Sequence, residues 1–363
     1  MSKTFLAINF GCRVNMAETN QWSQTLINQG YSPSTTYDLP SIIFINTCSI
    51  TKKGDIESLS KVRILHQKYP KAKIYVTGCA NLEKLKDIPN IIIYKNDQKE
   101  EILEKLNSFY TPQIKDKFSH TNRFLLKVQS GCSQFCSYCI VPQKRPKLWS
   151  LPTEEAIKTI NSAISNGYKE VIITGVNLNQ YQFGFSNLVE KLLEETNIEL
   201  ISFGSIPINC IDNKFISLLK NPKYKNRFSN FFHIPIQSGS DKILKLMNRP
   251  YTQKDILQTF NKIKEIFSPL VKEGIKGRFE NKKDLSFGTD IIVGFPGETN
   301  SDFQETLDIC KTIGFKKIHC FRYSSRPNTL AKNYYDSQPK IDKEILIKRS
   351  QQIRNLPTKL SNN

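Results

Sequence analysis

The sequence contains no long hydrophobic run. None of its apolar stretches approaches the roughly 18 residues that a membrane-spanning helix needs. The first residues, MSKTFLAINFGCRVN, have too short an apolar segment for a signal peptide and lack a small-residue cleavage site. These absences lead us to expect a cytoplasmic protein with no membrane partner.

Acidic residues are also scarce. Asp and Glu number 33 against 52 Lys and Arg, which gives a formal net charge of +19. Such an excess predicts a polyanionic partner such as nucleic acid. Only 11 of the 52 cations are arginine, the residue that binds phosphate through two hydrogen bonds at once. The positive charge is therefore spread mainly over lysines, which act as point charges. A solvated lysine-rich surface with no such partner is the alternative.

Short runs rich in β-branched residues alternate with helical patterns. The first third predicts a small open parallel α/β sheet with helices on its faces, because strands and helices alternate there. The strands expected in it are 4–10, 41–47, 73–78 and 90–94. The alternation then restarts and fits a partial (β/α)6 parallel barrel. Its expected strands are 123–129, 170–176, 198–205, 231–237, 287–293 and 317–322.

These patterns divide the chain into segments. We predict an N-terminal α/β domain over residues 1–110, a polar linker over 111–122, the partial barrel over 123–335, and a C-terminal helix and tail over 336–363. Further expected features are helices at 153–166, 299–313 and 340–356 and an inserted charged loop at 268–286.

The strongest chemical signal is GCSQFCSYCIVP, directly after the first barrel strand. Cys132, Cys136 and Cys139 have CxxxCxxC spacing there. Three thiolates in one short loop can hold three irons of a 4Fe-4S cluster and leave the fourth iron open to a substrate amine and carboxylate. Zinc would prefer four protein ligands in paired CxxC spacing. We therefore predict these three cysteines as cluster ligands and as the catalytic centre.

A second set of cysteines is spread over the first domain. Cys12, Cys48 and Cys79 each follow one of its first three strands. In a parallel sheet these positions meet at the carboxyl edge, where open α/β sheets build their sites. Three thiols that converge there could hold a second cluster, although an ordinary buried cysteine after a strand is the alternative for each. The remaining cysteines, expected to be core thiols, are Cys210, Cys310 and Cys320, and we expect no histidine to bind metal.

The residues around these cysteines resemble a known family. CxxxCxxC after the first strand of a partial barrel resembles the radical S-adenosylmethionine (SAM) superfamily, and the upstream cysteines in GCRVN, NTCSIT and VTGC resemble its methylthiotransferases. Later segments match the family in order: HIPIQSGSDKILKLMNRPYT (233–252), GTDIIVGFPGET (288–299) and FRYSSRPNTLA (321–331). The resemblance covers about residues 4–356. NTCSIT followed by Lys52 and Lys53 is most similar to the branch that acts on threonylcarbamoyladenosine.

This resemblance implies an enzyme with two 4Fe-4S clusters and SAM. It implies transfer of a methylthio group to C2 of threonylcarbamoyladenosine in the anticodon stem-loop of tRNA. A flavodoxin- or ferredoxin-type protein would be the reductant; the sulfur donor stays open, and we expect a monomer. The isopentenyladenosine branch is the main alternative, and a ribosomal-protein substrate fits least. A different radical enzyme and a non-catalytic iron–sulfur or RNA-binding remnant remain competing interpretations.

The resemblance and the strand-end positions also suggest residues that contact the cofactor. The SAM-binding candidates are Tyr138, Gly175, Asn177, Gln237, Ser238 and Asp290. Arg322, Tyr323 and Arg326 are the candidates for contact with RNA.

Two features depart from the family pattern. The segment after the cluster loop reads QKRPKLWS, in which only Arg145 matches the usual Arg-Gly-Arg type. Members usually end in a TRAM-type β-barrel that grips tRNA, and the sequence leads us to expect no such module here.

Overall fold

The computed structural model describes residues 3–34, 39–99, 101–102, 123–267, 285–338 and 341–357. The predicted linker lies outside this part of the chain, as does most of the predicted inserted loop. No described helix is long and apolar enough to cross a membrane.

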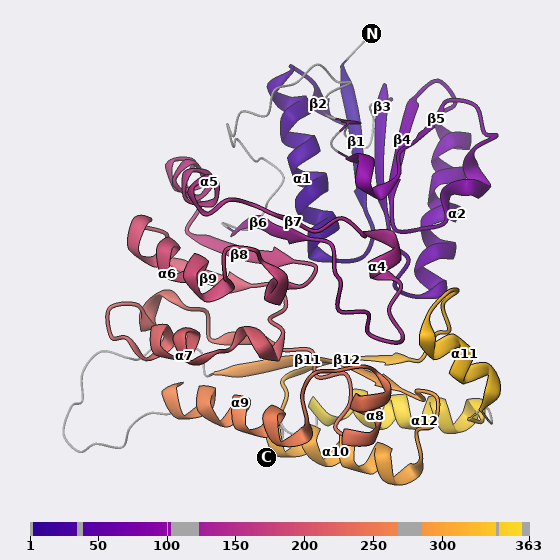
Figure 1. Cartoon of the computed structure of the whole chain (residues 1–363). Coiled ribbons are helices and arrows are strands. Elements are labelled where there is room, and N and C mark those ends of the chain that lie inside the picture. The colour runs from indigo at the N-terminus through magenta and orange to yellow at the C-terminus, as the bar shows by residue number, and fades with distance from the viewer. Residues whose placement is uncertain are drawn as a thin grey trace.

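The N-terminal part is a five-stranded parallel sheet (Figure 1), whose strand order is β2-β1-β3-β4-β5. Its strands are β1 (Thr4–Asn9), β2 (Ser32–Pro33), β3 (Ile42–Thr47), β4 (Lys73–Gly78) and β5 (Ile91–Ile93). Its helices are α1 (Arg13–Asn28) and α2 (Lys52–Lys68), and single 3-10 turns follow at Leu82–Leu85 and Asn96–Gln98. The four predicted strands are confirmed. The two-residue edge strand β2 was not predicted, because Ser-Pro has no strand pattern.

The two faces of this sheet are covered by different helices. On one face Trp22 and Leu26 of α1 pack against Phe5 and Phe44. On the other face Leu59, Val62 and Leu65 of α2 pack against the isoleucines of β3 and β4. Every residue of β3 is buried, as expected for the central strand of a sheet that is covered on both sides.

The second part is a partial barrel of six parallel strands. Its strands are β6 (Arg123–Ser130), β8 (Glu170–Gly175), β9 (Leu200–Phe203), β10 (Phe231–His233), β11 (Ser286–Val293) and β12 (Lys317–Arg322), with β7 (Trp149–Ser150) antiparallel to β6. The pairs β6–β8–β9 and β10–β11–β12 are parallel, and a bridge between Ile201 and Phe228 joins the two groups. All six predicted barrel strands are confirmed.

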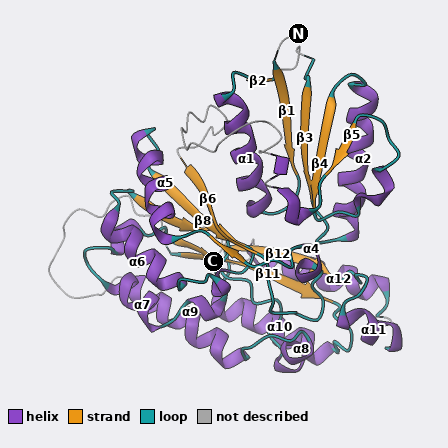
Figure 2. Ribbon diagram, turned by 45° about the horizontal axis from the view of Figure 1, so that its top comes forward, coloured by secondary structure: helices purple, strands orange, loops and turns teal. Residues whose placement is uncertain are grey.

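Helices cover the outside of this curved sheet (Figure 2). They are α5 (Thr153–Ser165), α6 (Phe185–Glu195), α7 (Asn213–Lys220), α9 (Gln253–Phe267), α10 (Asn300–Ile313) and α12 (Lys343–Arg354). The other helices of this part are α4 (Val141–Lys144), α8 (Asp241–Leu246) and α11 (Leu330–Ser337). Single 3-10 turns lie at Leu178–Gln180, Ile208–Cys210 and Lys225–Arg227. The predicted helices at 153–166 and 299–313 correspond to α5 and α10, and α12 lies within the predicted final helix.

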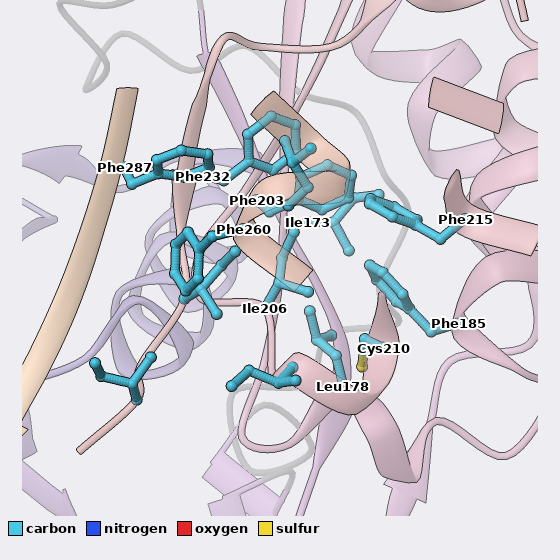
Figure 3. Packing of buried hydrophobic residues seen from close by; sticks show 14 of the residues in the cluster. Ile173, Leu178, Phe185, Phe203, Ile206, Cys210, Phe215, Phe232, Phe260 and Phe287 are labelled. Atoms are coloured by element: carbon cyan, nitrogen blue, oxygen red, sulfur yellow. The ribbon is translucent and has the colours of Figure 1, made fainter. Parts of the chain in front are cut away.

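The barrel core is aromatic. Phe203 packs within 6.4 Å, centroid to centroid, of the rings of Phe215, Phe228 and Phe232. Figure 3 shows Cys210 among these buried side chains. Cys210, Cys310 and Cys320 are all at most 8% exposed, so the prediction that they are core thiols is confirmed.

Candidate functional site

The CxxxCxxC loop leaves the carboxyl end of β6 and is held by contacts from distant segments. Ser137 donates its backbone N–H to Met247 O (3.1 Å) and its hydroxyl to Leu246 O (2.7 Å). Asn177, at the end of β8, lies with Nδ2 3.5 Å from Cys132 Sγ. The loop is therefore fixed at its start and in its middle, which helps to hold Cys132, Cys136 and Cys139 (the loop triad) in place.

The other set of cysteines comes together as the sequence predicts. Strands β1, β3 and β4 are neighbours in the sheet, so Cys12, Cys48 and Cys79 (the sheet triad) lie at the same carboxyl edge. Gly11 lets the loops approach, because a Cβ on it would lie 2.5 Å from Cys48 Sγ. Asn96 Nδ2 donates to Cys79 Sγ at 3.3 Å.

The thiols of each triad act on one another's ionisation. Burial, together with a smaller effect of the neighbouring Cys79 and Cys12, raises the pKa of Cys48 to about 11. Burial likewise raises the pKa of Cys139 to about 12, with Cys136 and Cys132 adding to the effect. A metal that binds these cysteines would displace their protons, because the deprotonated thiolate is the form that binds metal.

A single metal ion and a four-iron cluster require different arrangements of their ligands. Among the described residues, the one group of three ligands whose donor atoms all lie within 4.8 Å of one another is His233, Asp290 and His319. The cysteine triads fall outside that limit. A four-iron cluster holds its thiolates on separate irons, so it does not require them to meet around one centre, as a tetrahedral zinc ion with sulfurs about 2.3 Å away does.

A buried charge cluster joins the two parts of the molecule beside the sheet triad. Glu18 of α1 accepts from Arg145 Nη1 (2.8 Å) and Nη2 (3.0 Å), from Lys99 Nζ (2.5 Å) and from Lys127 Nζ (3.3 Å). Burial alone would raise the pKa of Glu18, but the three cations outweigh it and hold that pKa well below its usual range. Burial lowers the pKa of Lys99 to about 8. Arg145, singled out by its match to the family, therefore joins the barrel to the first domain.

A cavity of about 180 Å³ lies between the triads. Its walls come from the segment after Cys48, from the CxxxCxxC loop and from the carboxyl ends of three barrel strands. The lining residues are Ile50, Thr51, Tyr138, Gln237, Asp290, Ile292, Phe321, Arg322, Tyr323 and Ser324. Residues from both cysteine loops thus face one space.

The six SAM-binding candidates fall into three groups. Tyr138, Gln237 and Asp290 line the cavity. Asn177 lies beside the loop triad, whereas Gly175 lies at the end of β8, where an added Cβ would lie 2.7 Å from Leu178 Cδ2. Ser238 is not brought to the cavity, because it is 1% exposed and its hydroxyl lies 3.2 Å from Thr306 Oγ1 of α10.

Two histidines flank Asp290, a feature that sequence reasoning missed. Asp290 Oδ1 lies 3.2 Å from His233 Nε2 and 3.0 Å from His319 Nδ1. Burial would raise the pKa of Asp290, but these two hydrogen bonds lower it to about 2. Asp290 is therefore a fixed negative charge in the cavity wall. The pairing of His319 with Asp290 across β11 and β12 is a matter of register, which spacing along the chain does not reveal.

The hypothesis that Arg326 contacts RNA is wrong. Arg326 is 6% exposed and donates to Ser49 Oγ (2.6 Å) and to Asp55 of α2, so it joins the barrel to the first domain. Arg322 and Tyr323 do line the cavity.

The GFPGET segment (294–299) contacts two helices. Its Thr299 caps α10, and its Glu298 binds Arg349 of α12. The segment therefore begins α10 and anchors α12, the C-terminal helix of the described chain.

Comparisons with known proteins agree with this geometry. Residues 126–310 match the model of the radical SAM superfamily, and residues 4–95 match that of "Uncharacterized protein family UPF0004". A threonylcarbamoyladenosine tRNA methylthiotransferase (MtaB) of Aquifex aeolicus is 30% identical, over 96% of this chain and 86% of its own. This chain belongs to the radical SAM methylthiotransferases.

Another member of the methylthiotransferase family is equally similar. A tRNA-2-methylthio-N(6)-dimethylallyladenosine synthase of Endomicrobium trichonymphae is 31% identical, over 96% of this chain and 84% of its own. Among solved structures, the radical SAM methyltransferase TsrM of Kitasatospora setae aligns with a TM-score of 0.62 at 12% identity. That alignment covers 92% of this chain and 77% of TsrM. It shows that the fold is shared. The sequence identities to the two methylthiotransferases, 30% and 31%, do not distinguish between the substrates in their names.

The residues present fit the cofactors that a radical SAM methylthiotransferase implies. The loop triad offers three cysteines, and N–H donors lie close to the sulfurs of Cys132 and Cys136, which is how proteins stabilise iron–sulfur clusters. An iron–sulfur cluster and SAM therefore suit this part of the site.

Proposed function

We propose that this methylthiotransferase adds a methylthio group to C2 of threonylcarbamoyladenosine next to the anticodon of tRNA. The observation that carries the proposal is the cavity between the triads, because its walls include Ile50 and Thr51 beside Cys48, and Tyr138 between Cys136 and Cys139. A substrate base in that space would lie within reach of both cysteine centres. The name of the Aquifex relative and the NTCSIT segment favour this nucleoside.

We propose that each triad holds one 4Fe-4S cluster. When bound, the clusters and SAM would supply the radical and the transferable sulfur. The chain itself binds and orients the reactants. Tyr138 offers an aromatic face beside the loop triad, and Gln237 and Asp290 offer hydrogen-bonding groups for the amino, hydroxyl or ring N–H groups of a nucleoside.

The cavity wall also carries apolar surface. Ile50, Ile292, Phe321 and Tyr323 contribute it around the polar groups, and Ile50 and Phe321 are exposed until a substrate covers them. A bound substrate that covers this surface would displace water, which protects a radical from side reactions and strengthens the interactions of the Asp290 carboxylate. The fixed charge on Asp290 orients a donor group without itself taking a proton at neutral pH.

The proposed partner is the anticodon stem-loop. Bases in such a loop are accessible without opening a duplex, so one adenosine can enter the cavity at low cost. The net charge of +19 suits a polyanion and predicts salt-sensitive binding. A flavodoxin- or ferredoxin-type reductant, a monomeric state and a cytoplasmic location complete the proposal, while the sulfur donor stays open.

Methylthiolation of isopentenyladenosine is the second candidate, favoured by the name of the Endomicrobium relative. Mass spectrometry of tRNA nucleosides separates the two. The chain would be expressed in a host that lacks its own methylthiotransferases, with Cys136→Ala as the control. A methylthio-threonylcarbamoyladenosine that the control lacks is expected. Methylthio-isopentenyladenosine alone would overturn the choice of substrate, and neither product would overturn the proposed function.

A further inference from the structure

Buried arginines in this molecule usually have an acidic partner. Three buried arginines of the described chain each pair with a carboxylate: Arg145 with Glu18, Arg326 with Asp55 and Arg349 with Glu298. Burying a cation is costly unless an opposite charge offsets it. In each case the carboxylate supplies that charge.

Arg249 is different. Its Nη1 donates to Cys136 Sγ at 3.3 Å and its Nε donates to the Tyr251 hydroxyl at 2.7 Å. The strongest electrostatic neighbours of this half-buried side chain are Tyr138, Tyr251 and Cys136, and none of them is a carboxylate. Within the described chain, the group best able to offset the charge of Arg249 is therefore the sulfur of a predicted cluster ligand.

The residues around Arg249 keep it in this position. The Tyr251 hydroxyl donates in turn to Ile236 O at 3.2 Å, which ties Arg249 to the segment after β10. Asn248 Nδ2 donates to Phe135 O at 3.1 Å. Together with the contacts of Ser137 to residues 246 and 247, these bonds make residues 246–249 a clamp on the CxxxCxxC loop.

We propose that Arg249 is the positioning residue of the loop-triad cluster, where its positive charge offsets the Cys136 thiolate and raises the reduction potential of the cluster. The inference rests on the proposed function only in that Cys132, Cys136 and Cys139 hold a cluster. It does not depend on which nucleoside is modified.

The physical basis is the charge change on reduction. Adding an electron makes the cluster more negative, so a nearby cation and an N–H donor to sulfur stabilise the reduced state more than the oxidised state. Removing the cation should make the cluster harder to reduce. Lysine at position 249 keeps the charge but lacks the planar guanidinium that donates to both Cys136 Sγ and the Tyr251 hydroxyl. It should therefore restore part of the reduction potential.

The test is a redox titration followed by electron paramagnetic resonance on the reconstituted full-length protein. SAM is added in a parallel titration, because its binding to the open iron marks the signal of the loop-triad cluster. Arg249→Met is expected to move the midpoint potential of that signal to more negative values, and Arg249→Lys to move it less. The potential of the sheet-triad cluster is expected to stay at the wild-type value.

Arg227→Lys is the matched control. Arg227 is a half-buried arginine with no carboxylate partner among the described residues, and it donates to the backbone carbonyls of Leu193, Thr196 and Ile198 instead of to a cysteine. Its replacement should lower stability and leave both potentials unchanged. If Arg249→Met bound full iron and kept the wild-type potential, the inference would be wrong. Loss of the loop-triad cluster in Arg249→Met with retention in Arg249→Lys would support it, because charge alone then decides cluster binding.

Discussion

The two cysteine triads are built in opposite ways. Cys132, Cys136 and Cys139 lie in one loop, and the chain that holds them is the clamp at residues 246–249. Cys12, Cys48 and Cys79 come from three loops and meet only because β1, β3 and β4 are neighbours in the sheet. The loop triad therefore depends on local geometry, while the sheet triad depends on the integrity of a whole domain and of its contact with the barrel.

The largest expected effect comes from removing one cysteine of each triad. Cys136→Ala should abolish both SAM cleavage and product, because the open iron that would bind SAM belongs to the cluster proposed at the loop triad. Cys48→Ala should abolish product while SAM cleavage continues, because the loop triad is intact. The measurement is 5′-deoxyadenosine release under dithionite beside nucleoside mass spectrometry.

Cys210→Ala is the control for this pair. Cys210 is buried in the barrel core, and its charged neighbour is Asp212 instead of a triad cysteine, so both activities should persist. Loss of SAM cleavage in Cys48→Ala would show that the triads do not work separately.

The charge cluster at Glu18 should matter most to the sheet triad. Glu18→Gln leaves Lys99, Lys127 and Arg145 without their carboxylate in a buried place, which should cost about 3–5 kcal/mol of unfolding free energy. Urea denaturation measures this cost. We also expect iron to leave the sheet triad first as the contact between the two parts weakens.

Glu57→Gln is the matched control for Glu18→Gln. Glu57 pairs with Lys53 on the exposed face of α2, where both side chains are more than half exposed. Exposed pairs contribute roughly 0–1 kcal/mol, so a similar cost for both variants would contradict the role of the Glu18 cluster.

A smaller effect is expected from Gly11→Ala. Gly11 has φ of +88°, and an added Cβ would lie 2.5 Å from Cys48 Sγ. Gly30 has a similar φ of +81° but no atom within 4 Å of an added Cβ. Both alanines should cost about 1 kcal/mol of backbone strain, and only Gly11→Ala should also lower the iron content of the sheet triad.

Thermal unfolding and iron analysis of these two glycine variants separate strain from the clash with Cys48. Equal iron contents would mean that the close approach of Gly11 to Cys48 is unimportant for the triad.

The last effect concerns the loop-triad side and depends on pH. Asp302 completes the capping box of α10 with Thr299 and binds Lys242 and Ser240, next to the helix that leads into the clamp. Burial would raise the pKa of Asp302, but these partners and Thr299 lower it below its usual value. A lowered carboxyl pKa adds stability above the pKa of the unfolded chain, about 3.9, and this stability is lost as pH falls through the folded pKa.

Asp302→Asn should therefore cost about 1–2 kcal/mol at pH 7, with the difference from wild type shrinking below about pH 4. Denaturation at both pH values measures it. A constant difference across this range would mean that the charge of Asp302 does not contribute.

The contrast between the triads also explains what could be predicted from sequence. The loop triad is a spacing pattern, and the β-branched runs around Ile43, Val76 and Ile172 predict their strands without further information. The sheet triad follows once the strand order is assumed. Pairs such as Arg145 with Glu18 or Arg249 with Cys136 join residues more than 100 positions apart, so no local periodicity reveals them.

Arg326 is a residue whose environment the sequence pattern predicted wrongly. Its place between aromatic and polar residues suggested an exposed contact for RNA, but Asp55 on α2 turns it inward. A sequence pattern states which residue types are near one another along the chain. Whether a charged side chain faces solvent or a partner depends on tertiary packing, which decides most of the cavity wall.

Iron analysis with Mössbauer spectroscopy of the reconstituted protein tests the central claim most directly. Two clusters on two separate triads predict about eight irons per chain, and about four when either Cys136 or Cys48 is replaced by alanine. The spectra should show four-iron clusters in all three proteins. About four irons in the wild type, unchanged in Cys48→Ala, would contradict the account, because the sheet triad would then hold no cluster.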